Sequence, residues 1–295
     1  GGVADAAGQR AERRAALDKA VSWLLDHPAD AFDGGRNGVC AEIVTFYYLL
    51  SCPQLGENRT VYRSAIQERL ARLNAGAGNR IEPDEYEMLA TAAYIARQLK
   101  IEFPAFDVVA ERARRQALSV RADGSGLRPL SLCTYLNRLD RGQEVPCGIE
   151  QSALYREHSE RRVATVLSGP VDRTKAAAVR LGLFSIAGDV CVLTDFGRQR
   201  PAQAAVLDDR GFWAELCEGG IRWGMETGDF LLVARLVLVA KCLCVESAVP
   251  SFEAAVDYLT QHQEADGSFG PANPYSPNPF REGVLAGVMA IASGL

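Results

Sequence analysis

The chain has 295 residues, of which 48% are apolar and 23% are charged, with a formal net charge of −5 and an isoelectric point near 5.4. This composition is typical of a globular protein that is long enough to bury a sizeable core. It lacks the basic stripe with which proteins contact nucleic acids or anionic membranes, so we expect neither as a partner.

Apolar residues recur at spacings of three and four along nearly the whole chain, whereas strict alternation of apolar and polar residues is almost absent. This pattern predicts an all-α protein with a short flexible N-terminus at residues 1–10. Gly, Pro, Asp and Asn residues divide the remainder into twelve helices. They are expected at 11–26, 38–52, 59–74, 83–100, 105–119, 128–141, 147–160, 171–193, 208–224, 229–246, 251–264 and 280–294.

The predicted helices alternate in character. Odd-numbered helices have one apolar stripe and a charged face, whereas even-numbered helices such as 229–246 and 280–294 are apolar nearly all round, which indicates burial on several sides. We therefore expect six stacked hairpins of one outer and one inner helix. Because the last helix is too apolar for a capping repeat, the prediction is a closed (α/α)6-type toroid in one domain, residues 1–295. An irregular domain of twelve helices is the alternative.

No window of ~18 consecutive apolar residues occurs, and the N-terminus does not resemble a signal peptide, which predicts a cytoplasmic protein. Eight cysteines lie mostly inside apolar helical runs, where a free thiol behaves as a small hydrophobic group. We therefore expect reduced thiols and no disulfide framework.

A turn follows the eleventh predicted helix, in the sequence YLTQHQEADGSFG at residues 258–270. Gly267 can adopt a positive φ, Asp266 and Ser268 can cap the next segment, and Phe269 can pack back onto the hairpin. The predicted role of this turn is structural. Degenerate copies occur as ADGSG at 122–126 and as AFDGGRNG at 31–38.

This turn resembles the repeat signature of the α/α-toroid family, which includes terpene cyclases and protein prenyltransferases. The resemblance implies a toroid fold and no particular substrate. The chain is also similar to an uncharacterised family of actinobacterial proteins of about this length, in the stretches AEIVTFYYLL at 41–50 and VCVLTDFG at 190–197. A Thr-His pair of that family is replaced here by Ala187-Gly188, so no role resting on that histidine carries over.

The active-site motifs of the toroid enzymes are missing from the sequence. The paired aspartates Asp208-Asp209 fit neither the DxDD nor the DDxxD pattern of terpene cyclases. His27, His158 and His262 are the three histidines, and none lies at ligand spacing from a cysteine, so we expect no zinc site and no other cofactor. An α/α-barrel glycosidase is an alternative, although three tryptophans offer few sugar platforms.

Three charged residues interrupt the apolar inner helices: Glu42, Asp189 and Arg235. A buried charge indicates either an ion pair or a ligand site. Glu42 and Asp189 are therefore candidate catalytic bases, because desolvation favours the protonated form of a carboxyl group, or they are structural partners of an inner arginine. Arg235 could bind a carboxylate, sulfate or phosphate through two parallel hydrogen bonds, or pair with one of these carboxylates.

Further polar side chains lie on inner helices, at their starts, or in the proline-rich loop PANPYSPNP at 271–279, which is either a lid or a rigid connection. They complete the predicted substrate-binding set: Tyr47, Tyr48, Tyr86, Tyr135, Arg138, Tyr275 and Arg281.

These residues favour a small-molecule enzyme of bacterial specialised metabolism that works without metal. In this hypothesis an arginine holds the anionic group of the substrate while a buried carboxylate removes a proton, which suits ring closure or elimination. The alternative is a non-catalytic or half-catalytic subunit of a hetero-oligomer, docked through apolar anchors such as Trp213 and Trp223.

Overall fold

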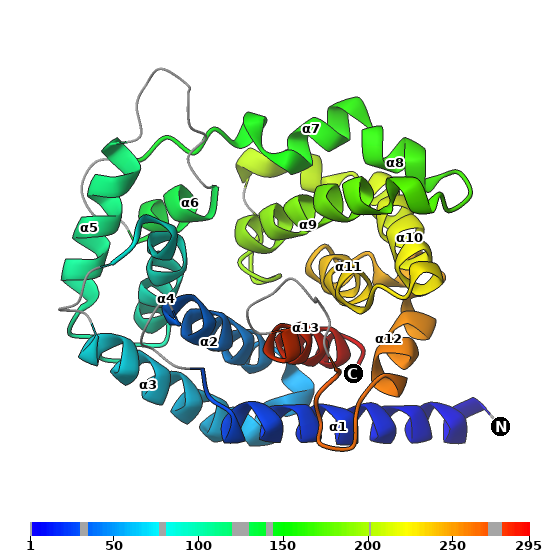
Figure 1. Ribbon diagram of the computed structural model, residues 1–295, viewed down its shortest axis with the longest axis horizontal. Helices are drawn as coiled ribbons and strands as arrows, with labels where there is room; N and C mark the ends of the chain where they lie inside the picture. The colour runs from blue at the N-terminus through cyan, green and yellow to red at the C-terminus, as the bar shows by residue number, and fades with distance from the viewer. Residues whose placement is uncertain are drawn as a thin grey trace. The chain divides into compact units, whose positions relative to one another are not determined.

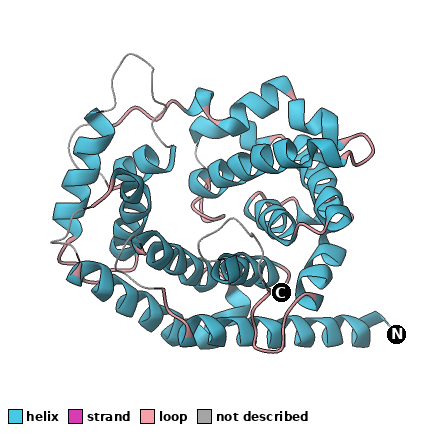
Figure 2. Cartoon of the chain, viewed as in Figure 1, coloured by secondary structure: helices cyan, strands magenta, loops and turns pink. Residues whose placement is uncertain are grey.

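The computed structural model describes residues 2–29, 35–76, 81–119, 130–139, 144–200, 202–270 and 279–295. Throughout these ranges the regular elements are helices, which confirms the predicted all-α class (Figures 1 and 2). Contacts between residues separate the chain into two compact units. The small unit is His27–Ile149, and the large unit combines Gly1–Asp26 with Glu150–Leu295.

The small unit contains helices α2 to α6, which alternate between two layers. The bounds are α2 Arg36–Leu50, α3 Arg59–Ala75, α4 Tyr86–Gln98, α5 Phe106–Ser119 and α6 Leu130–Arg138. Helix α2 packs on α3 and α4, and α4 packs in turn on α5 and α6. The predicted inner helices α2, α4 and α6 therefore form one row, and the more polar α3 and α5 cover it, as the hydrophobic pattern predicts.

The large unit is arranged around α11, which contacts α9, α10, α12 and α13. Its helices are α1 Gly2–Asp26, α7 Ala153–Glu160, α8 Arg162–Leu167, α9 Ala176–Leu193, α10 Arg210–Thr227, α11 Phe230–Cys242, α12 Phe252–Gln261 and α13 Pro279–Ser293. Every residue of α11 except Arg235 and Lys241 is buried. Helix α1 packs against α13 and α12. The predicted inner helices α9, α11 and α13 again lie side by side.

Short 3-10 helices connect several of these elements. They are Pro53–Asn58, Pro83–Glu85, Ile149–Gln151, Arg173–Lys175, Ala202–Asp208 and Glu246–Ala248. Glu85 stabilises the 3-10 helix Pro83–Glu85, which precedes α4, because its carboxylate accepts the backbone N–H of Glu82 at 2.9 Å. This is the capping role that a carboxylate at a helix start favours.

The helices depart most from the predictions at two places. Helix α1 begins at Gly2, so residues 2–10 of the expected flexible segment are helical, because Ala, Gln and Arg residues favour the helix even where they are exposed. An additional helix, α8, follows α7 after Arg161, whose φ of 52° breaks the helical path. Glu157 stabilises this break, since its carboxylate accepts the N–H groups of Val163 at 3.1 Å and Ala164 at 2.8 Å.

Helix α9 is less enclosed than an inner helix was expected to be. Leu181 is 71% exposed, although the helix is apolar on all sides. Among the described residues, Arg173–Leu193 is also the helical stretch whose length and hydropathy would suffice to cross a membrane, with 39% of its most apolar window buried. Core helices of soluble proteins meet the same criteria, so the absence of a membrane partner stays a prediction.

The turn at 258–270 has the structural role predicted for it. Asp266 Oδ1 accepts hydrogen bonds from the backbone N–H of Ser268 at 2.9 Å and from its hydroxyl at 2.7 Å. Gly267 has a φ of +95°, and a Cβ there would lie 2.5 Å from a backbone oxygen of α1. Phe269 is buried against the large unit. The turn therefore joins α12 to α1 and tolerates only glycine at its tightest point.

Three features of the sequence lie outside the described residues. These are the turn copy at 122–126, residues 31–34 of the second copy, and the loop at 271–278 with Tyr275. The predicted single domain of residues 1–295 also stays a prediction.

A buried ion pair lies in the core of the small unit. Arg69 Nη2 is 3.5 Å from Glu42 Oε1, and the side chains of both residues are at most 1% exposed. The Glu42 carboxylate also accepts the N–H of Ala29 at 2.8 Å, and the Arg69 guanidinium lies 5.0 Å from the ring of Phe46. This geometry favours the structural alternative for Glu42 over the catalytic one. Its partner is on the outer helix α3, and not on an inner helix as expected.

Replacing Arg69 with Met should destabilise the protein by about 3–5 kcal/mol, because the substitution leaves a buried carboxylate without its cation. The measurement is the free energy of unfolding in urea. The matched control is Arg115→Met, which removes an exposed i,i+4 pair with Glu111 and should leave stability close to that of the wild type. Equal effects of the two substitutions would contradict a structural role for the Glu42–Arg69 pair.

Candidate functional site

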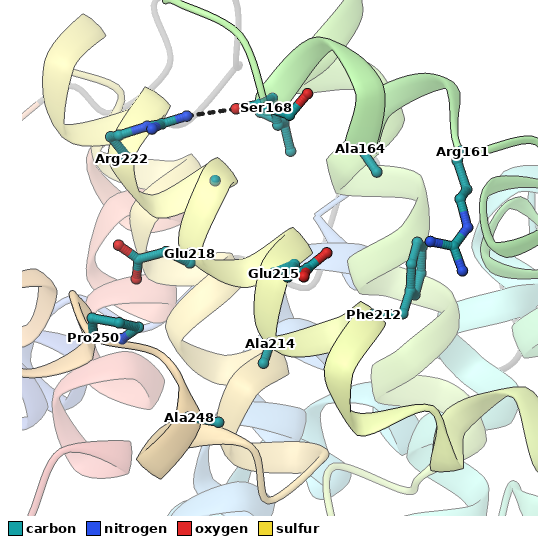
Figure 3. Close-up of a pocket in the computed structure, with 12 residues that line it drawn as sticks. Arg161, Ala164, Ser168, Phe212, Ala214, Glu215, Glu218, Arg222, Ala248 and Pro250 are labelled. Carbon is teal, nitrogen blue, oxygen red and sulfur yellow. Dashed lines mark hydrogen bonds between the residues drawn. The ribbon is translucent and has the colours of Figure 1, made fainter.

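The large unit contains a pocket of about 540 Å³ between α8 and α10 (Figure 3). This volume is within the range of small-molecule binding sites, which are mostly apolar with a few polar groups that fix orientation. The lining has that composition: Arg161, Ala164, Leu167, Ser168, Phe212, Ala214, Glu215, Glu218, Gly219, Arg222, Ala248 and Pro250.

Helix α10 contributes half of the lining residues, and their spacing of mostly three or four places them on one face of the helix. The helix begins after Asp209, whose Oδ1 accepts the backbone N–H of Phe212 at 3.2 Å. Gly219 allows α8 to approach, since a Cβ at this position would lie only 3.0 Å from Leu167 Cβ. The local sequence thus fixes both where α10 starts and how close α8 comes.

Two arginines lie at opposite ends of the pocket residues drawn in Figure 3. The guanidinium of Arg161 lies 5.1 Å from the centroid of the Phe212 ring, a cation–π contact that orients the charge. Arg222 Nη2 donates a hydrogen bond to the backbone oxygen of Leu167 at 2.5 Å. Positive charge is therefore held at both ends of the pocket wall, which also carries two glutamates.

The two glutamates of the pocket have different roles. Glu218 accepts hydrogen bonds from the backbone N–H of Ser251 at 2.8 Å and from its hydroxyl at 2.6 Å, just before α12 begins. Its carboxylate therefore stabilises the start of α12. Glu215 is exposed and lies between Glu218 and Phe212 in the close-up (Figure 3). Glu215 is the carboxylate better placed to contact a ligand.

A histidine–aspartate pair adjoins the pocket. His158 Nε2 lies 2.8 Å from Asp209 Oδ2, and the imidazole packs edge-on against Phe212 with ring centroids 4.9 Å apart. The hydrogen bond to His158 is the main cause that lowers the pKa of Asp209, helped by the N–H of Phe212 and the charges of His158 and Arg161. An ionised Asp209 fixes the imidazole and leaves Nδ1 as the nitrogen that could exchange a proton.

Asp189 and Arg235, the other two charged residues predicted for the site, do not line this pocket. Asp189 Oδ2 accepts the backbone N–H of Leu154 at 3.2 Å, so this carboxylate stabilises the start of α7. Arg235 is partly exposed. Its charge contributes to lowering the pKa of the Cys191 thiol, although the hydrogen bond from Cys242 is the larger cause.

Two of the predicted binding residues meet in the small unit. The Arg138 guanidinium lies 5.3 Å from the ring centroid of Tyr135 and 5.7 Å from that of Tyr94. The two tyrosine rings are 5.1 Å apart. This cluster joins α4 to α6, so its contacts are those of packing between inner helices.

The remaining predicted residues are spread over both units. Tyr47 and Tyr48 are buried within α2, and Tyr86 is partly exposed at the start of α4. Arg281 lies over the ring of Trp23 at 5.8 Å, which links α13 to α1 in the large unit. None of them lines the pocket between α8 and α10.

Sequence reasoning missed the pocket residues because it searched for charges on inner helices, whereas the pocket is built by α8 and α10. The one available signal was the Asp208-Asp209 pair directly before a helix, which is typical of a helix cap. No local pattern indicates that Asp209 would meet His158, 51 residues earlier in the chain.

The proposed docking anchors Trp213 and Trp223 are buried in the core, which corrects the expectation that they are exposed. Trp213 Nε1 donates a hydrogen bond to the backbone oxygen of Val206 at 2.9 Å. Both rings lie on the face of α10 that packs into the large unit, and the charged face carries the pocket. Within the ranges that the structure describes, no three His, Cys, Asp or Glu side chains converge as a metal site requires.

Comparison with known proteins places the chain in a family. A family model described as a domain of unknown function, DUF6895, matches residues 6–284, which includes nearly all of both units. No curated protein and no solved structure matches the chain. The chain therefore belongs to the DUF6895 family.

Proposed function

We propose that the protein is an enzyme that binds a small anionic molecule in the pocket between α8 and α10 and transfers a proton with His158. The observation that carries this proposal is that Arg161 and His158 both contact the ring of Phe212, which lines the pocket. Its ring contacts both the Arg161 guanidinium and the imidazole of the His158–Asp209 pair. An anion-binding group and an oriented proton acceptor thus lie at the same end of the pocket.

Binding would depend on Arg161 first. The stacking of its guanidinium on Phe212 orients the charge and leaves N–H groups for two parallel hydrogen bonds to a carboxylate or phosphate. Arg222 supplies a second positive charge, with one nitrogen occupied by the Leu167 oxygen. The apolar side chains of the pocket, Phe212 among them, would contact the uncharged part of the ligand.

Proton transfer would depend on His158. Hydrogen bonding to a carboxylate is the arrangement that orients a catalytic imidazole and stabilises its protonated form. In an elimination, Nδ1 accepts a proton from carbon, the C–H electron pair forms the new double bond, and the anion held by Arg161 departs. Ring closure by an internal nucleophile uses the same acceptor. In this proposal His158 takes the role first assigned to Glu42, whose carboxylate is paired with Arg69.

We also propose that the six inner helices belong to one (α/α)6 toroid. The support is that each unit contributes three of them, each row covered by more polar helices. This is the arrangement that the repeated hairpins predict.

Replacing Arg161 with Met should weaken anion binding about ten- to a hundredfold, the effect of losing a charge-assisted hydrogen bond of about 1.5–3 kcal/mol. Inorganic phosphate is the probe, and the measurement is its effect on the thermal unfolding midpoint. The control is Arg162→Met at the next residue, which is exposed and paired with Glu160. Equal responses of the two variants to phosphate would exclude Arg161 as the anion-binding group.

Replacing His158 with Asn should raise the pKa of Asp209 toward its ordinary value, because the largest cause of its lowering is removed. In the wild type, the lowered pKa of Asp209 means that its ionised carboxylate stabilises the folded state at pH values above the ordinary aspartate pKa. This stabilisation is lost as the pH falls through the lowered pKa of Asp209. Carboxyl ¹³C NMR titration measures the shift. Asp172, whose pKa is lowered by Thr174, is the internal control and should not change. An unchanged Asp209 titration would contradict the pair.

A second function, as a subunit of a larger complex, is favoured by the exposed apolar face of α9. Exposed small and apolar residues follow one another at helical spacing along it: Ala177, Leu181, Ser185 and Gly188. Such a face is typical of a protein contact. It replaces the two buried tryptophans as the candidate docking surface.

The subunit hypothesis predicts that Leu181→Asp lowers the mass of the assembled protein to that of one chain without lowering its thermal stability, since Leu181 is exposed. Light scattering gives the mass, alone and after coexpression with the product of the neighbouring gene. Val61→Asp, at an exposed residue of α3, is the control. A wild-type chain that has the mass of one chain under both conditions would rule this function out.

A further inference from the structure

The side chain of Asn137 holds the segment that carries Cys147 against α6, which carries Cys133; we call this contact the Asn137 clamp. The Asn137 side chain donates to the Val145 oxygen at 2.7 Å and accepts the Val145 N–H at 2.8 Å, which fixes the extended segment after α6 against that helix. As a result the thiol of Cys147 lies against α6 next to Cys133, with Thr134 Oγ1 donating to Cys147 Sγ at 4.0 Å. The same Asn137 amide donates to Cys147 Sγ at 3.3 Å.

The two thiols differ in their environments. Cys133 is fully buried on α6, where its thiol donates to the oxygen of Leu130 at 3.3 Å, whereas Cys147 is partly exposed. The neighbouring Cys133 thiol is the largest cause that lowers the pKa of Cys147 to about 7, and the hydrogen bonds from Thr134 and Asn137 lower it further despite its partial burial. The same interaction raises the pKa of Cys133. Cys147 is therefore the thiol that ionises and can be reached.

We propose that Cys147 and Cys133 form a redox-active dithiol, in which Cys147 reacts with hydroperoxides and Cys133 resolves the product into a disulfide. The Cys147 thiolate attacks a peroxide oxygen, so that an S–O bond forms, the O–O bond breaks and an alcohol or water leaves with the proton. Cys133 then attacks the sulfenic sulfur, the S–S bond forms, the S–O bond breaks, and water leaves. Two thiols are oxidised and one hydroperoxide is reduced.

A second thiol pair, Cys191 and Cys242, differs from the first in being inaccessible to an oxidant. Cys191 and Cys242 of the large unit also lie next to each other, but both are buried beneath the turn at Gly197. A peroxide cannot reach them in the folded protein. They therefore provide a matched control inside the same chain. The lone thiol of Cys244 is exposed and serves as the comparison for an accessible cysteine without a resolving partner.

Metal binding is the other chemistry open to paired thiols. In the part of the chain that the structure describes, no third Cys, His, Asp or Glu side chain joins Cys133 and Cys147 in a metal-binding group. Oxidation needs only the two thiols and is therefore favoured.

The first test is the alkylation rate of each cysteine in the full chain, measured by peptide mass spectrometry with iodoacetamide across pH. Cys147 should react roughly five- to tenfold faster than Cys244 at pH 7, because greater ionisation outweighs the lower nucleophilicity of a weaker base. Its rate should level off above about pH 7, because the pKa of this thiol is lowered to about 7. A Cys147 rate equal to that of Cys244, rising through pH 9, would overturn the proposal.

The second test is oxidation by hydrogen peroxide. The wild type should form a disulfide between Cys133 and Cys147, while the Cys133→Ser variant should accumulate a sulfenic acid that dimedone traps at Cys147. Asn137→Ala and Thr134→Val each remove a donor to the Cys147 sulfur, and each should slow the reaction. Disulfide formation at Cys191 and Cys242 at the same rate, or none at Cys133 and Cys147, would refute the assignment.

Discussion

The proposed site depends on one carboxylate, that of Asp209. One of its oxygens accepts the N–H of Phe212 and starts α10, and the other holds His158. The start of α10 sets the rotation of the helix, which turns Glu215 and Arg222 toward α8 and turns Trp213 into the core. Moving this cap by one residue would rotate each of these side chains by roughly a quarter turn. Helix start, pocket wall and imidazole orientation are therefore one structural feature.

Charges on the inner helices turn out to serve the fold more than the pocket. Glu42 is paired with Arg69, and Arg36 at the start of α2 is paired with Glu85 at 3.0 Å. Both pairs connect consecutive layers or hairpins of the small unit, where an unpaired charge would be strongly unfavourable. A charge in an apolar helix thus indicates burial and pairing. It does not by itself indicate a substrate site, because pairing satisfies the same physical requirement.

The sequence predicted the helical class, the alternation of two layers and the role of the 258–270 turn, because each follows from local periodicity or from residues close in the chain. Helix α11 is the clearest case, since its continuous apolar run implies the burial that is observed. The left-handed Arg161 could not be anticipated, because no glycine marks it. The site was missed for a related reason: His158 and Asp209 meet through tertiary packing, which leaves no periodic signal.

The reactivity of the cysteines also depends on tertiary packing that the sequence does not indicate. Composition predicts reduced thiols in an apolar interior, and eight free cysteines agree with it. Composition cannot separate two thiol pairs that differ in access. The difference in access arises from the surroundings of each thiol. The Asn137 clamp holds Cys147 in an extended segment at the surface, whereas Cys242 lies on α11 beneath Gly197. Reactivity requires both a donor-rich environment and a path for the oxidant, and only Cys147 of these two has both.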